Sequence, residues 1–87
     1  MDDKTFAMIK ELTELQGTSG NERNIRNYMR ERMAPLVDRI ETDGLGGIFG
    51  IREHEDETAP RIMVAAHMDE VGFMVSGITA RGLFRFV

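Results

Sequence analysis

The sequence contains no cysteine and no long apolar run, and each absence excludes a class of protein. Without cysteine among its 87 residues, the chain has no disulfide framework, no thiolate metal site and no cysteine nucleophile. No stretch approaches the about 20 apolar residues that cross a bilayer. The acidic start at residues 1–4 also differs from a secretory signal peptide. We therefore expect a soluble, cytoplasmic protein without a membrane partner.

Basic residues are in the minority, with 11 lysines and arginines against 15 aspartates and glutamates, and the net charge is −4. A nucleic-acid-binding domain of this size is usually basic, so no nucleic-acid partner is expected. The chain is 41% hydrophobic and 30% charged, which is typical of a folded domain. A domain this small buries only about 60–65% of its unfolded surface. It must therefore pack efficiently, bind something, or be part of something larger.

A first amphipathic helix is predicted over residues 4–16. Met8, Leu12 and Leu15 recur there at helical spacing and form one apolar face. Acidic residues precede it, at the end where the helix dipole favours negative charge. Gly17 has the position of the left-handed residue that often follows a helix.

A second helix is predicted to follow, because Ser19 and Glu22 have the spacing of a capping box, with Ser19 as the N-cap. It should end at about residue 34, before Pro35. Its apolar positions, expected to be buried, are Ile25, Met29 and Met33.

Beyond residue 36 the pattern favours strands. Residues 37–42 and 48–52 are predicted to pair as a hairpin around the glycine-rich turn at residues 43–47. Residues 62–66 (IMVAA) form an unbroken apolar run, typical of a strand buried on both faces in the middle of a sheet.

A second hairpin is predicted from residues 71–78 and 83–87. Its last strand is rich in aromatic side chains, and an uncovered strand edge of that kind favours aggregation. Two helices are also few for covering both faces of a sheet. We therefore expect the 87 residues to be a piece of a larger protein.

His67 and Asp69 directly follow the apolar run, and ligands bind at the carboxyl ends of strands in open α/β sheets. In an extended chain both side chains lie on one side. One imidazole nitrogen of His67 could then bind a metal while the other donates to the Asp69 carboxylate. The alternative is that His67 is only a satisfied polar side chain at a strand end. The other histidine, His54, lies in an acidic run that is more simply explained as a solvated loop.

Residues 65–75 (AAHMDEVGFMV) closely resemble the first metal-site motif of the tetrahedral (TET) aminopeptidases. These are di-metal glutamyl and deblocking aminopeptidases, some of which carry the name endoglucanase or cellulase. Residues 17–22 (GTSGNE), 42–46 (TDGLG) and 82–86 (GLFRF) match the same family in order and spacing. Gly47 departs from the family, which commonly has asparagine at this turn.

The resemblance implies an α/β fold and an enzyme several times longer than this chain. Residues 1–72 would be the N-terminal part of a zinc-peptidase-like α/β domain, with two helices followed mainly by strands. Residues 73–87 would begin an inserted, PDZ-like β domain used in dimerisation. Family members assemble into hollow homo-oligomeric dodecamers.

The resemblance also implies the site. His67 would ligate one of two divalent metal ions, zinc or cobalt, and Asp69 would belong to the catalytic machinery as the carboxylate that orients His67. The other ligands and the general-base glutamate would come from later sequence. The resemblance further implies a cis Asp69–Glu70 peptide bond in the complete enzyme. The substrates would be peptides that lose an N-terminal residue, either glutamyl or aspartyl or neutral.

Two functions remain open. The chain is either an N-terminal fragment of such an aminopeptidase, inactive alone, or a stand-alone, non-catalytic interaction or assembly module that keeps the family's half-fold.

Overall fold

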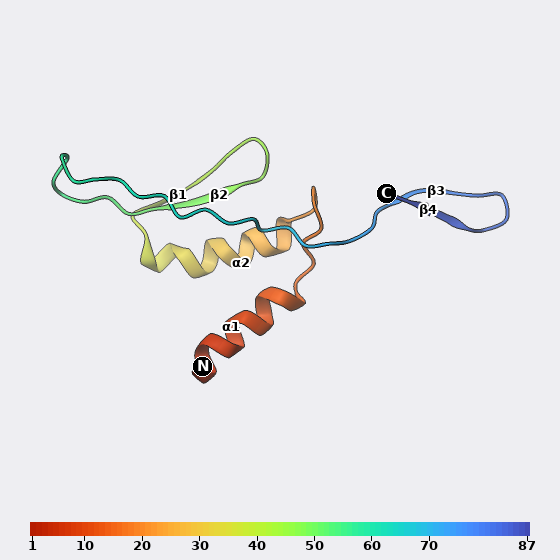
Figure 1. The fold of residues 1–87 in the computed structure, drawn as a ribbon, viewed down its shortest axis with the longest axis horizontal. Coiled ribbons are helices and arrows are strands. Elements are labelled where there is room, and N and C mark those ends of the chain that lie inside the picture. The colour runs from red at the N-terminus through yellow and green to blue at the C-terminus, as the bar shows by residue number, and fades with distance from the viewer.

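The computed structural model describes residues 1–87, in which two helices and two separate β-hairpins follow one another along the chain (Figure 1). The first helix, α1, spans Asp3–Glu14, close to the prediction. Asp2 caps it, because its Oδ1 accepts the backbone N–H of Thr5 at 2.7 Å. The helix ends in an extended Leu15, and Gly17 does not have a positive φ, so the predicted left-handed role of Gly17 is wrong.

The second helix, α2, spans Arg23–Met33 and begins later than predicted. The predicted Ser19 cap is wrong: Glu22 stands at the N-cap position and no side chain caps the helix. The cause is a tight turn, in which Asn21 donates its N–H to the Thr18 carbonyl at 2.8 Å and Gly20 adopts φ 82°. Glu22 does reach back, as in a capping box, but it accepts the N–H of Gly20 at 2.8 Å.

At its other end, α2 passes into a 3-10 turn, η1 (Ala34–Leu36), which contains Pro35, so the predicted stop is confirmed. The apolar positions of α2 face the first hairpin, but Ile25, Met29 and Met33 are only half-buried. None of the helices combines the length and apolar character needed to cross a membrane.

The first hairpin pairs β1 (Arg39–Thr42) with β2 (Ile48–Ile51) in antiparallel register, and Thr42 lies opposite Ile48. This confirms the predicted hairpin, with shorter strands. The Asp43 carboxylate holds the turn by accepting the N–H groups of Leu45 at 2.9 Å and Gly47 at 2.7 Å.

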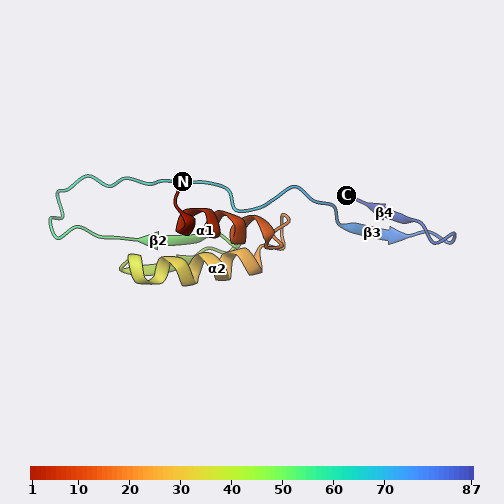
Figure 2. The same ribbon diagram turned by 90° about the horizontal axis from the view of Figure 1, so that it is seen from below.

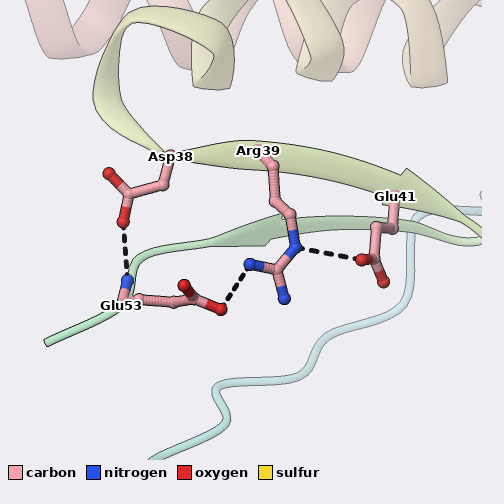
Figure 3. A network of polar contacts seen from close by, with 4 residues as sticks. All are labelled: Asp38, Arg39, Glu41 and Glu53. Carbon is pink, nitrogen blue, oxygen red and sulfur yellow. Dashed lines mark hydrogen bonds and ion pairs between the residues drawn. The ribbon is translucent and has the colours of Figure 1, made fainter.

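A network of polar side chains links the ends of β1 and β2 that lie opposite the turn (Figure 3). Arg39 donates from Nε to Glu41 at 3.0 Å and from a terminal nitrogen to Glu53, and the Glu53 N–H donates to Asp38 at 2.7 Å. These hydrogen bonds to carboxylates raise the pKa of Arg39, and the bond to Glu53 has the largest effect. The four side chains are exposed, and they join the two strands at the surface.

Residues 62–66 do not form the predicted buried strand. Ile62 is 87% exposed and Val64 is 94% exposed, and no residue from 60 to 69 forms a backbone–backbone hydrogen bond. Figure 2 shows this segment as an extended trace separated from β2. A strand needs neighbours to satisfy its backbone groups, and no other strand lies beside it.

The second hairpin pairs β3 (Val75–Ile78) with β4 (Phe84–Phe86) and contains an irregularity between Val75 and Gly77. It confirms the predicted hairpin and stands apart from the helices in both views (Figures 1 and 2). Phe73, which precedes β3, packs edge-to-face against Phe86 of β4, with ring centroids 4.7 Å apart.

The chain as a whole is extended. Its radius of gyration is 17.8 Å, against about 12 Å for a compact domain of this length. Its accessible surface is 7958 Å², against about 5,200 Å² for a compact protein of this mass. No hydrophobic side chain is fully buried. The chain is therefore a small α/β unit with two helices and short strands, arranged without a closed core.

Candidate metal centre

The predicted pair, His67 and Asp69, lies on the extended segment that precedes the second hairpin. The Nδ1 atom of His67 lies 3.1 Å from Asp69 Oδ1 and 3.0 Å from the Asp69 carbonyl oxygen. The His67 side chain is 85% exposed and that of Asp69 is 42% exposed. The two side chains therefore meet, although the strand predicted to carry them is absent.

Both neighbours of Nδ1 are acceptors, so the hydrogen-bond network assigns the imidazole proton to Nδ1. The lone pair of Nε2 then faces away from Asp69 and can bind a metal. A carboxylate on the far nitrogen fixes the tautomer and increases the basicity of the ligating one. The geometry suits one imidazole ligand and one orienting carboxylate.

The chain does not bring a third ligand to this pair. No group of three or more histidine, aspartate or glutamate side chains is placed to hold a metal ion. His54 accepts the backbone N–H of Asp56 at 3.0 Å within its own loop. In the same loop, hydrogen bonds from Thr58 lower the pKa of Asp56, and the bond from the Thr58 side chain has a larger effect than the bond from its backbone. This agrees with the interpretation of residues 54–58 as a solvated loop.

A backbone contact that the sequence did not reveal lies next to the pair. The N–H of Glu70 donates to the Gly17 carbonyl at 2.8 Å, and the N–H of Gly17 donates to Glu70 Oε1 at 3.1 Å. Thr18 and Glu70 form an isolated parallel bridge. The only sequence signal was that glycines occur in both segments, at Gly17 and Gly72, and a helix end explained the first equally well.

An open groove of about 1730 Å³ lies between residues 59–70 and the inner face of α2 and β2. Its lining mixes the polar residues of the candidate centre with apolar side chains of the helix and strand, among them Ile25, Met29, Met33, Ile48 and Ile51. His67 and Asp69 both line it. The candidate centre therefore opens into the largest hollow of the chain.

Comparison with known proteins links this geometry to a family. A family model described as M42 glutamyl aminopeptidase matches residues 46–87, and a model described as AMPT matches residues 3–29. The chain is 58% identical over 82 residues to the glutamyl aminopeptidase of Lactococcus lactis subsp. cremoris (strain MG1363), covering 94% of this chain and 23% of that protein.

Two solved structures have the same fold over this region. The TET aminopeptidase of the marine sediment archaeon Thaumarchaeota archaeon SCGC AB-539-E09 superposes with a TM-score of 0.86 at 40% identity, over 98% of this chain and 23% of that one. The endoglucanase of Thermotoga maritima gives a TM-score of 0.78 at 38% identity, over 90% of this chain and 25% of that one. The chain thus spans about a quarter of the length of the curated relatives that it matches.

Proposed function

Because the chain belongs to the M42 aminopeptidase family, we propose that it contributes part of the metal centre of a metal-dependent aminopeptidase. The observation that carries the proposal is the contact of His67 Nδ1 with Asp69 Oδ1, which leaves Nε2 free. This pair lies inside the region that the M42 model matches. It also lines the groove, where a substrate could reach it.

In this proposal His67 binds one of two divalent ions, zinc or cobalt, through Nε2. Asp69 accepts a hydrogen bond from Nδ1–H of His67 and so holds the ring in one orientation. The lone pair of Nε2 then stays directed at the metal. Bound metal would supply an activated water and polarise the scissile carbonyl. The further ligands and the general base lie outside these 87 residues, so the chain alone is inactive.

The proposed substrates are peptides with a free N-terminus, cleaved after a glutamyl, aspartyl or neutral residue. The relative from Lactococcus lactis is called a glutamyl aminopeptidase, which supports the acidic preference. We assign residues 1–72 to the catalytic α/β domain and residues 73–87 to the start of an inserted PDZ-like β domain. The separation of the second hairpin from the rest of the chain supports that division (Figure 1). We further propose a cytoplasmic homo-oligomer, a dodecamer built from dimers.

The second candidate is a stand-alone interaction or assembly module without catalytic activity. It is favoured by the exposure of large apolar side chains over the extended segment and the second hairpin, including Val71 at 97% and Phe73 at 74%. The intact mass of the protein in its native source separates the two candidates. A mass of 9.9 kDa would favour the module, and a larger mass would favour the enzyme.

Replacing the proposed ligand tests the function in the native protein that carries this sequence. His67→Ala should lower peptidase activity by more than about 100-fold and reduce the metal content, since the loss of a partner that only orients a ligand already costs about 10–100-fold. The matched control is His54→Ala, because His54 is also exposed but lies in the acidic loop. Activity and metal content of His67→Ala equal to those of His54→Ala would refute the assignment.

A further inference from the structure

We propose that Glu70 is a positioning residue, which clasps the segment carrying His67 and Asp69 to the loop after α1. The clasp consists of Gly17, Thr18 and Glu70. This inference rests on the proposed function, because it concerns the metal centre of that function. The backbone N–H of Glu70 donates to the Gly17 carbonyl, and its side chain accepts the Gly17 N–H, so both polar groups of Gly17 are used.

The clasp is the only hydrogen-bonded link between residues 60–73 and the rest of the chain. The other polar contact in this segment is internal, between His67 and Asp69. Asp69 is the next residue before Glu70, so the clasp fixes the backbone from which the Asp69 carboxylate reaches His67. Without it, no hydrogen bond would join the segment of the pair to the rest of the chain.

The backbone segments around Gly17 and Gly72 approach their neighbours so closely that a side chain at either position would meet other atoms. Gly17 is the one buried residue of the chain, and a Cβ there would lie 3.2 Å from Ile25 Cγ2. A Cβ at Gly72 would lie only 2.2 Å from Thr18 Cγ2. A side chain at position 72 would therefore press the two segments apart, whereas one at position 17 would press against Ile25 of α2.

The geometry disfavours the alternative that Glu70 is itself a metal ligand. One of its carboxylate oxygens is already bonded to the Gly17 N–H. In an extended chain, side chains alternate, so that of Glu70 lies on the side opposite to those of His67 and Asp69. The two roles also differ chemically. A glutamine at position 70 can still accept the Gly17 N–H through its amide oxygen, but it replaces a charged metal ligand by a poor one.

The first test measures Zn²⁺ affinity of the native protein by competition with a chromophoric chelator. Glu70→Ala should weaken binding about 10–100-fold, as for loss of other groups that orient a ligand. Glu70→Gln should stay within about threefold of the wild type, because the amide still accepts the same hydrogen bond. An equal loss in Glu70→Gln and Glu70→Ala would overturn the proposal, as would wild-type affinity in Glu70→Ala.

A second pair of variants opens the clasp without touching Glu70. Gly72→Ala should weaken Zn²⁺ binding, because its methyl group would collide with Thr18 Cγ2. Adding Thr18→Ser removes that carbon, so the double variant should recover the affinity. Failure of the double variant to recover it would contradict the clasp. In the metal-free protein, the ¹⁵N shift of His67 Nδ1 should move in Glu70→Ala and Gly72→Ala, and return in Glu70→Gln and in the double variant.

His67→Ala separates this inference from the function on which it rests. Loss of Zn²⁺ binding in His67→Ala together with wild-type binding in Glu70→Ala would refute the clasp alone. Wild-type Zn²⁺ binding in His67→Ala would refute the proposed metal centre itself.

Discussion

At the scale of single residues, Gly17 shows why a local pattern can mislead. A glycine after an amphipathic helix usually takes the left-handed position, and the sequence predicts that role. In the structure its φ is not positive, and the absence of a side chain instead allows the approach of Glu70, 53 residues later. Both roles are compatible with the same local sequence around Gly17. Only the contact with Glu70 distinguishes them.

Asp2 gives a prediction at the same scale. Its carboxylate accepts the Thr5 N–H, so Asp2→Ala should fray the first turn of α1, whereas Asp2→Asn should keep most of the cap. Helical ¹³Cα shifts of residues 3–6 measure the effect. The control is Asp3→Ala, since Asp3 lies in the first turn but does not form the capping bond. Equal fraying in the Asp2 and Asp3 variants would contradict the assignment of the cap.

The pH dependence of this cap has a defined sign. The backbone N–H of Thr5, more than any other group, lowers the pKa of Asp2 below its ordinary value of 3.8. Because the pKa of Asp2 is lower in the folded state, its carboxylate stabilises α1 at pH values above the pKa of the unfolded state. This stabilisation is lost as the pH falls through the pKa of the folded state. The amide shift of Thr5 should therefore titrate below pH 3.8. A midpoint at or above that value would contradict the capping bond.

At the scale of elements, both hairpins could be predicted because the information is local. Asp43 and the glycines around it encode the first turn, and Thr79 and Gly82 encode the second. The run at residues 62–66 is apolar but contains no turn residue that would specify a strand pairing. Whether it becomes a strand depends on neighbours that the chain does not place beside it, and for that reason the prediction failed.

The contact between α1 and α2 also required the structure. Tyr28 donates its hydroxyl to Glu11 Oε2 at 2.6 Å, and Arg32 donates to both of them, at 3.2 Å to the hydroxyl and 3.1 Å to the carboxylate. The guanidinium also lies 5.3 Å from the centre of the Tyr28 ring. Periodicity places these residues on their helices but does not say that the two helices meet.

This contact yields a spectroscopic prediction, because Tyr28 is the only tyrosine. Donation to Glu11 is the main cause that raises the pKa of Tyr28 above its ordinary value of 10.0. Glu11→Ala should therefore lower the pKa of Tyr28, measured by phenolate absorbance against pH. Glu14→Ala is the control, since Glu14 lies on the same helix without bonding to Tyr28. An unchanged titration in Glu11→Ala would show that the two helices do not meet at Tyr28.

At the scale of the whole molecule, the candidate centre could be predicted only in part. The spacing of His67 and Asp69 is local, and the structure brings the two side chains together. The clasp at Gly17 depends on contacts between distant segments and could not be inferred from spacing. No third histidine, aspartate or glutamate side chain joins the pair to form a group that could hold a metal ion.

The last prediction is that the 87 residues, purified alone, do not hydrolyse aminoacyl or peptide substrates. A catalytic zinc needs about three protein ligands, and two ions that share a water need roughly twice as many. The chain offers His67 as the proposed ligand and Asp69 as its proposed orienting partner, while Glu70 is hydrogen-bonded to Gly17. Removing groups that act as a unit abolishes nearly all of the catalytic advantage.

Added Zn²⁺, Co²⁺ or Mn²⁺ should therefore bind weakly and without fixed stoichiometry. The open groove and the exposed aromatic hairpin, with Phe84 at 66% and Phe86 at 61%, should instead drive self-association. The measurement is an assay of the homogeneous chain with leucyl and glutamyl anilides across the three metals, coupled to size-exclusion chromatography. Metal-dependent turnover that co-elutes with the 9.9 kDa species and disappears in His67→Ala, but not in His54→Ala, would show that these residues form a complete site.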